Sequence, residues 1–126
     1  MLLDTHAWIE LLRGSALGNE VATLLSEQPC FTAMPTLTEL GSWTLRRRFD
    51  HAFILKKVRS LSTLLPLSED GAILAGKLHF EFRKSISDWG MLDSLIYATA
   101  LLHGQELVTG DPHFKGKPHV IFLGES

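Results

Sequence analysis

Short apolar runs alternate with longer amphipathic stretches along this chain of 126 residues. The apolar runs have the character of short buried strands and cover residues 1–4, 29–33, 64–67, 106–109 and 119–123. Between them, apolar residues recur at helical spacing, which predicts helices over 5–13, 18–27, from 36 into 46–48, from 50 onward, 68–83 and 91–103. This alternation indicates an α/β domain with a mainly parallel central sheet and helices on both faces.

The segment 91–114 brings two carboxylates to one edge of the predicted sheet. Its helix ends at His103-Gly104 and is about 20 Å long. About six extended residues cover a similar distance, so the strand over 106–109 runs back alongside the helix. Asp93, near the start of the helix, and Asp111, just past the strand, are therefore expected at the same edge.

Basic residues gather before and within the helix that begins at Asp50. They are Arg46, Arg47, Arg48, Lys56, Lys57 and Arg59. The spacing predicts that Phe53 lies on the buried side of this helix, with the charges outside. Such a cluster is consistent with sequence-independent contacts to RNA phosphates and equally with a solvated helix surface.

The length, the single cysteine, the net charge and the apolar runs of the chain limit the kinds of protein that it can be. A chain of this length forms one domain, expected over 1–126. Cys30 has no partner for an intrachain disulfide, and no cysteine-based zinc site is expected. The net charge of −2 argues against a uniformly basic nucleic-acid coat. No apolar run reaches the ~20 residues of a membrane span, and the start of the chain lacks a signal-peptide pattern, so a cytoplasmic location is expected.

Four acidic residues are predicted to converge at one edge of the sheet. Asp4 ends the first strand, and Glu39 lies in the first turn of the helix after the second strand. Together with Asp93 and Asp111 they occupy the edge where parallel α/β sheets bind ligands.

Each of these residues also has a purely local explanation. Asp4 is a candidate N-cap, and Thr36 with Glu39 fits a capping box. Asp93 is a first-turn acid that the helix dipole favours, and Asp111 before a proline suits the opening of a turn.

The set as a whole favours a metal site. Two unit charges ~4 Å apart repel each other by about 4 kcal/mol at an effective dielectric near 20. A divalent cation would relieve that repulsion. Ligands that are all oxygen favour Mg²⁺ or Mn²⁺ over zinc, and such ions activate water for phosphodiester cleavage.

The ordered segments LLDTHAWIELL, PTLTELG, LDSLIYATALLHG and ELVTGDPHF resemble the four signature segments of PIN-domain proteins, and most of all the VapC-type toxin ribonucleases of toxin–antitoxin modules. The resemblance implies a three-layer α/β/α fold with a mainly parallel sheet and a metal-dependent endoribonuclease. It also implies a homodimer and a small antitoxin that blocks the site. The family's acidic metal ligands correspond to Asp4, Glu39, Asp93 and Asp111, and its hydroxyl position corresponds to Thr109.

The chain departs from the family pattern at two places. Toxins of this family often carry a basic residue where Gly110 stands, and further acidic residues near Lys115. These departures bear on a second metal ion, which Asp111 would mainly serve. Asp88 is a rival to Asp93 as a ligand, but Asp93 lies within the helical pattern and Asp88 in the preceding connection.

Two other classes of function remain open at this point. The first is a non-catalytic module that keeps the PIN fold and binds RNA or a protein partner. The second is a phosphotransferase with Asp4 as nucleophile, against which stands His6 in place of a second aspartate two residues on. Uptake of Mn²⁺ separates an enzyme of the nuclease type from a pure binding module.

Overall fold

The computed structural model describes residues 1–125 and shows a parallel five-stranded sheet in the order β3-β2-β1-β4-β5. The strands are β1 (Leu2–Leu3), β2 (Phe31–Ala33), β3 (Thr63–Leu65), β4 (Leu107–Thr109) and β5 (Val120–Phe122). The helices are α1 (Thr5–Arg13), α2 (Ala16–Glu27), α3 (Met34–Arg46), α4 (His51–Leu61), α5 (Glu69–Arg83) and α6 (Met91–Leu102), with a 3₁₀ turn over Pro112–Phe114.

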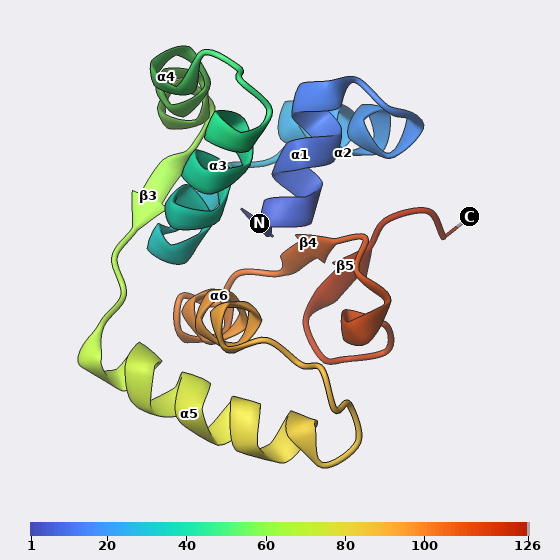
Figure 1. The fold of residues 1–126 in the computed structure, drawn as a ribbon. Helices are drawn as coiled ribbons and strands as arrows, with labels where there is room; N and C mark the ends of the chain where they lie inside the picture. The colour runs from blue at the N-terminus through green and yellow to red at the C-terminus, as the bar shows by residue number, and fades with distance from the viewer. Residues whose placement is uncertain (126) are drawn as a thin grey trace.

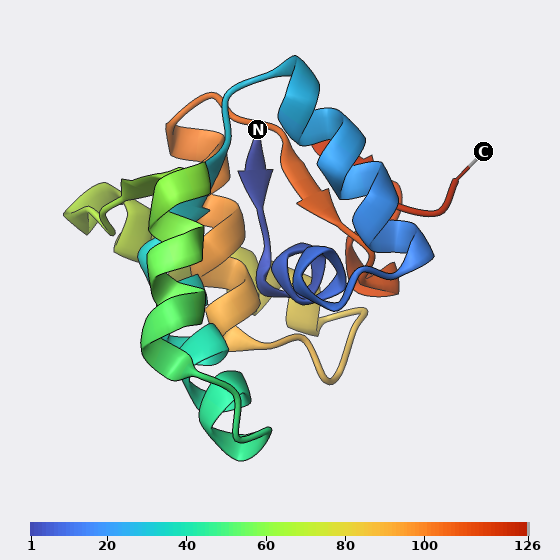
Figure 2. The same ribbon diagram turned by 90° about the horizontal axis from the view of Figure 1, so that it is seen from above.

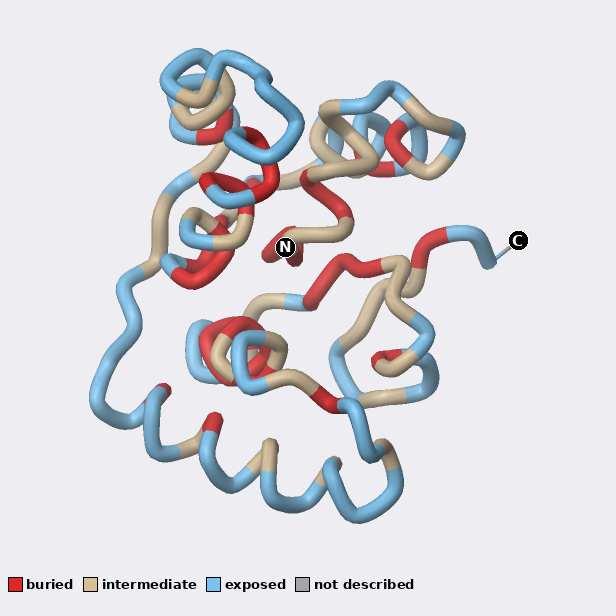
Figure 3. Tube along the Cα trace, in the orientation of Figure 1, coloured by how far each residue is buried: buried red, intermediate tan, exposed pale blue. Residues whose placement is uncertain are grey.

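Helices cover both faces of the sheet, which confirms the predicted three-layer α/β/α fold (Figure 1). Alternate residues of each central strand face opposite layers, as the pleat of a strand requires. Leu3 and Val108 pack into the core formed with α1 to α4, whereas Leu2 and Leu107 pack into the core formed with α5 and α6. Buried residues are concentrated in β1, β4 and α6, while α5 and α4 are largely exposed (Figure 3).

The central strands set the position of the functional edge. β1 and β4 lie side by side and point the same way, and α1 begins where β1 ends (Figure 2). The backbone N–H of Asp4 donates to the carbonyl oxygen of Val108 at 3.1 Å, so the ends of the two strands are aligned. Among residues 1–125, no helix combines the length and apolar character that a membrane crossing needs.

Two helices begin earlier than the sequence predicts. α2 begins at Ala16 because the Ser15 hydroxyl caps it by accepting from the N–H of Gly18 at 3.1 Å. α3 begins at Met34, since Pro35 suits the first turn of a helix, where its missing N–H costs nothing. The N-cap of α3 is Ala33, which makes no side-chain cap.

The predicted capping box in α3 is therefore wrong. Thr36 lies inside the helix and Glu39 lies beyond its first turn, not within it. The placement of Phe53 is also wrong. Its side chain is 63% exposed, because α4 stands at the edge of the molecule and the side of α4 that carries Phe53 packs against no further layer.

Candidate functional site

Asp4 and Asp111 follow adjacent parallel strands. Asp4 comes directly after β1 and caps α1, since its Oδ1 accepts from the N–H of Ala7 at 2.8 Å. Asp111 comes two residues after β4 and opens the 3₁₀ turn, with its Oδ1 accepting from the N–H of His113 at 2.9 Å. The register between β1 and β4 brings the two caps to the same edge of the sheet.

Glu39 and Asp93 reach this edge from helices. Asp93 lies in the first turn of α6, as the sequence predicts. Glu39 lies on α3, where its Oε1 accepts a hydrogen bond from the hydroxyl of Thr5. Since Thr5 follows Asp4 directly, this bond ties the α3 carboxylate to the start of α1. We call the edge that carries Asp4, Glu39, Asp93 and Asp111 the acidic edge.

Thr109 links two of the carboxylates. Its side chain is fully buried at the end of β4. The hydroxyl oxygen accepts from the backbone N–H of Asp111 at 3.0 Å, and the Thr109 side chain lies close enough to the Asp4 carboxyl to lower the pKa of that group. A hydroxyl that accepts from one residue has its proton left to donate to the other. Thr109 therefore fixes Asp4 and Asp111 relative to each other.

Burial is the main perturbation of Asp4 and Asp93, and the neighbouring carboxylates add to it. Burial raises the pKa of Asp4 to about 7, and the charges of Asp93 and Asp111 act in the same direction. The hydrogen bonds from Thr109 and from the N–H of Ala7 oppose that rise. Burial, followed by the charges of Asp111 and Glu39, raises the pKa of Asp93 to about 6. Uncompensated negative charge is thus held in a poorly solvated place, which is a property of functional sites.

The donor set at this edge suits a hard divalent cation. All of its side-chain donors are oxygens, the ligands that Mg²⁺ and Mn²⁺ prefer. No three acidic, histidine or cysteine side chains among residues 1–125 converge tightly enough to form a ready-made cage. Mg²⁺ does not require one, since it keeps several waters and is usually held by one or two carboxylates. The residues therefore fit a hydrated ion and not an enclosed structural metal.

His113 belongs to the surroundings of the site. Its Nε2 lies 3.2 Å from Asp88 Oδ1, and its Nδ1 lies 3.6 Å from Asp111 Oδ1. The ring also packs near Trp89, with centroids 6.2 Å apart. Asp88 is exposed and faces His113, whereas Asp93 faces the other carboxylates.

Gly110 is explained by His6. A Cβ at position 110 would lie 2.6 Å from Cε1 and 2.8 Å from Nδ1 of the His6 ring. Such distances are closer than real contacts, so the imidazole occupies the space that a side chain at 110 would need. His6 Nδ1 is buried there without a hydrogen-bond partner within residues 1–125. The glycine at position 110, where the family pattern often has a basic residue, thus leaves room for the His6 ring.

Solved structures of similar fold come from bacterial toxin–antitoxin systems. A toxin–antitoxin complex from Klebsiella pneumoniae superposes with a TM-score of 0.77 at 24% identity, over 95% of this chain and 94% of that one. VapBC2 from Rickettsia felis bound to a promoter DNA fragment gives 0.75 at 20% identity, over 96% and 95%. VapC20 from Mycobacterium tuberculosis, described as a sarcin–ricin loop cleaving toxin, gives 0.71 at 18% identity, over 93% and 94%.

At these identities the likeness establishes the fold alone. Comparison with curated proteins gives no significant match. The sequence itself matches the PIN domain over residues 1–119, nearly its whole length. The parallel sheet agrees with this match, which shows that the chain belongs to the PIN-domain family.

Proposed function

We propose that this chain is a metal-dependent endoribonuclease and the toxin of a toxin–antitoxin module, acting on RNA in the cytoplasm. The observation that carries the proposal is the convergence of Asp4, Glu39, Asp93 and Asp111, with the pKa of the buried Asp4 raised to about 7. Carboxylates are the side chains that hold the divalent ion of such a nuclease, and one or two of them are enough for a hydrated Mg²⁺. The names of the similar structures, which include toxin–antitoxin complexes and an RNA-loop cleaving toxin, support the same assignment.

In this proposal Asp4, Glu39 and Asp93 hold Mg²⁺ or Mn²⁺, and Asp111 completes the site. When bound, the cation supplies Lewis-acid activation of water and offsets the charge that develops on the phosphate during hydrolysis. The reaction adds water across one phosphorus–oxygen bond, which leaves a phosphate on one RNA fragment and a hydroxyl on the other.

The surrounding side chains position these ligands. Thr5 donates to Glu39 and so holds that carboxylate at the start of α1. Thr109 holds Asp111 through its backbone N–H and Asp4 through its side chain. His113 lies beside Asp111, with its Nδ1 3.6 Å from Oδ1 of that carboxylate.

The proposed partners are RNA as substrate, a small antitoxin protein and a second copy of the chain. Large apolar side chains remain exposed on the described part of the chain, among them Ile73 on α5 and Leu102 on α6. Exposed apolar surface of this kind is typical of protein interfaces. Light scattering on the purified chain, alone and with a co-expressed antitoxin, checks both assemblies.

A non-catalytic binding module is the second candidate. The observation in its favour is that no compact three-residue metal group exists among residues 1–125. Such a module would take up no Mn²⁺ and would leave RNA intact.

The test is cleavage of a mixed RNA by the full chain in Mn²⁺ and in EDTA. The proposal predicts fragments with Mn²⁺ and intact RNA with EDTA. Cleavage that persists in EDTA contradicts the metal mechanism. Intact RNA in both conditions, together with no binding of Mn²⁺, replaces the proposal with the binding module.

A further inference from the structure

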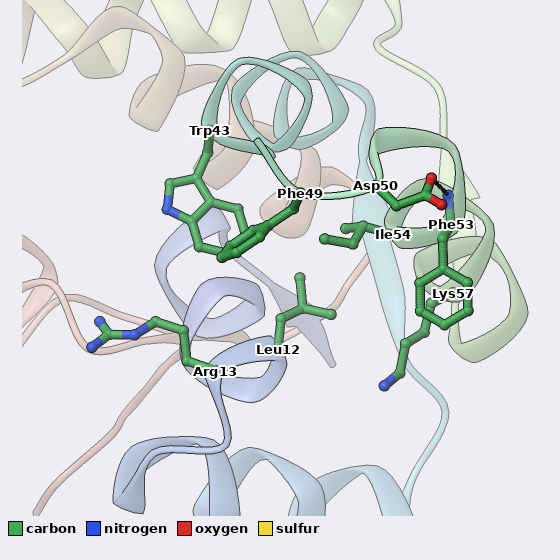
Figure 4. Close-up of a pocket in the computed structure, with 8 residues that line it drawn as sticks. All are labelled: Leu12, Arg13, Trp43, Phe49, Asp50, Phe53, Ile54 and Lys57. Carbon is green, nitrogen blue, oxygen red and sulfur yellow. Dashed lines mark hydrogen bonds between the residues drawn. The ribbon is translucent and has the colours of Figure 1, made fainter. Parts of the chain in front are cut away.

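A pocket lies at the opposite end of α1 from Asp4. We call residues 46–59 the basic hairpin. They run from the last residue of α3 through most of α4. Residues of α1, α3 and the basic hairpin enclose a pocket of about 280 Å³ (Figure 4). This volume is just below the ~300–1,000 Å³ of sites for small organic ligands, so it suits one planar ring system.

Aromatic and aliphatic side chains form the walls of the pocket. The rings of Trp43 and Phe49 pack edge to face, with centroids 5.4 Å apart and planes at 65°. Leu12 and Ile54 lie between them and Phe53, as Figure 4 shows. The side chains of Phe49 and Phe53 are 47% and 63% exposed, so large aromatic surface faces solvent without a partner in this chain.

Positive charge surrounds these walls. Arg13 and Lys57 line the pocket on either side of Leu12 (Figure 4). The guanidinium carbon of Arg47 lies 5.9 Å from the centre of the Trp43 ring. Six of the chain's 12 basic residues fall within the basic hairpin, although the whole chain carries a net charge of −2.

One carboxylate lines the pocket, that of Asp50, and Glu10 lies 3.6 Å from the Arg13 guanidinium at the rim. Asp50 is the only acidic residue of the basic hairpin, and it caps α4 by accepting from the N–H of Phe53 at 3.0 Å. The rim therefore complements a negatively charged ligand, and the walls complement a flat aromatic one.

Single-stranded RNA has both properties. Its bases stack on aromatic side chains regardless of sequence, and its phosphates are attracted to nearby basic groups. α1 has nine residues, so about 13 Å separates the pocket end of the helix from the end that holds Asp4. At ~3.4 Å or more per nucleotide, an RNA strand at the acidic edge reaches the pocket within about four nucleotides.

We propose that this pocket binds an unpaired base of the RNA that the acidic edge cleaves, with Arg13, Arg47 and Lys57 contacting the flanking phosphates. The inference rests on the proposed nuclease function and deepens it. It assigns the preference for single-stranded substrate to residues that lie outside the acidic edge.

The test measures by fluorescence anisotropy how tightly the full chain binds labelled single-stranded oligouridine and oligoadenosine in EDTA. The variant is Phe53→Ala, and the matched control is Phe80→Ala, which removes an equally exposed phenylalanine (66%) from α5. Loss of one stacked base predicts at least about fivefold weaker binding for Phe53→Ala and no change for Phe80→Ala. A strand of the same length without bases is expected to bind both variants like the unchanged chain, since the basic groups remain.

Three results would overturn the inference. Equal affinity of Phe53→Ala and the unchanged chain for oligouridine and oligoadenosine shows that no base occupies the pocket. If the unchanged chain binds neither oligouridine nor oligoadenosine, the pocket is again not a site for an RNA base. Loss of antitoxin binding by Phe53→Ala with RNA binding intact assigns the pocket to a protein partner. The nuclease proposal is judged separately, by Mn²⁺-dependent cleavage with the unchanged chain, so either idea can fail alone.

Discussion

The acidic edge and the basic hairpin lie at opposite ends of α1, carry opposite charges and are built in opposite ways. Asp4, Glu39, Asp93 and Asp111 come from four distant segments. The charges of Asp93 and Asp111 act on Asp4, and the charge of Glu39 acts on Asp93, because parallel strands and their helices end near one edge. The basic hairpin is one continuous stretch, and its charge is visible in the sequence. One region depends on the topology of the whole domain, and the other on local composition.

Their electrostatics differ in the same way. Burial and mutual repulsion raise the pKa of Asp4 and Asp93, so the acidic edge is strained unless a cation is present. The arginines of the basic hairpin are exposed to water, which screens them from one another. Chemistry is therefore expected from the acidic edge, and attraction of the substrate from the hairpin.

The largest effect is expected from Asp4→Asn and from Asp93→Asn. Removing one metal-binding charge costs several kcal/mol of transition-state stabilisation, so each variant should lose at least about a hundredfold in RNA cleavage. Circular dichroism should show an unchanged fold. Asp70→Asn removes the corresponding first-turn charge from α5 and is the control. Normal cleavage by either site variant would show that the acidic edge is not catalytic.

The next effect concerns the stability of the metal-free protein between pH ~4 and ~7. Because the pKa of Asp4 is raised to about 7, the folded chain keeps a proton there that the unfolded chain has already released. This contribution to stability is complete below the unfolded pKa and is lost as the pH rises to about 7. A unit of pKa shift corresponds to about 1.4 kcal/mol, so the loss amounts to a few kcal/mol.

Chemical denaturation in EDTA at several pH values checks this dependence. The free energy of unfolding of the unchanged chain, minus that of Asp4→Asn, should fall as the pH rises, because an amide does not titrate. A difference that rises with pH over this interval would mean that Asp4 is a stabilised carboxylate and that the acidic edge carries no stored repulsion.

A smaller effect is expected from Thr109→Val. The substitution leaves the backbone N–H of Asp111 without its acceptor and frees the Asp4 carboxyl. The lost hydrogen bonds should cost about 1–3 kcal/mol of stability and roughly a tenfold drop in cleavage. Thr99→Val is the control, since that buried hydroxyl bonds only to the carbonyl of Leu95 in its own helix. If both variants cleave equally well, Thr109 supports the fold and not the site.

The smallest effect belongs to the basic hairpin. Changing Arg46, Arg47 and Arg48 to glutamine removes exposed charges and should leave stability unchanged. Binding of single-stranded RNA should become less sensitive to salt, with the log–log slope reduced by about 0.7 for each lost phosphate contact. Arg83→Gln with Lys84→Gln on α5 is the comparison. An unchanged slope would make the hairpin a solvated surface.

The sequence predicted the elements well where an amphipathic pattern and a cap agree. The helix over 5–13 was found at those residues, capped by Asp4, and Ser68 caps the helix that ends at Arg83. Phe53 escaped prediction because helical spacing identifies an apolar stripe without showing whether a layer covers it. The start of α3 was missed because Pro35 favours an earlier first turn than the Thr36 pattern suggested.

The candidate site was predictable at the level of topology and not at the level of contacts. The strand–helix order alone indicated that Asp4, Asp93 and Asp111 would share an edge. The bond from Thr5 to Glu39 depends on how α1 and α3 pack, and the space that His6 takes beside Gly110 depends on side-chain packing. Three of the local explanations also hold. Asp4 caps α1, Asp111 opens the 3₁₀ turn, and Asp93 lies in the first turn of α6. A local role and a place in the cluster are compatible.

The most direct measurement is a calorimetric titration of the RNA-free chain with Mn²⁺. The double variant Asp4→Asn, Asp93→Asn is titrated in the same way for comparison. The account predicts that the unchanged chain binds the ion and that the double variant does not, although both are folded. Equal binding by the two proteins, or none by the unchanged chain, would contradict the claim that the acidic edge is a metal centre.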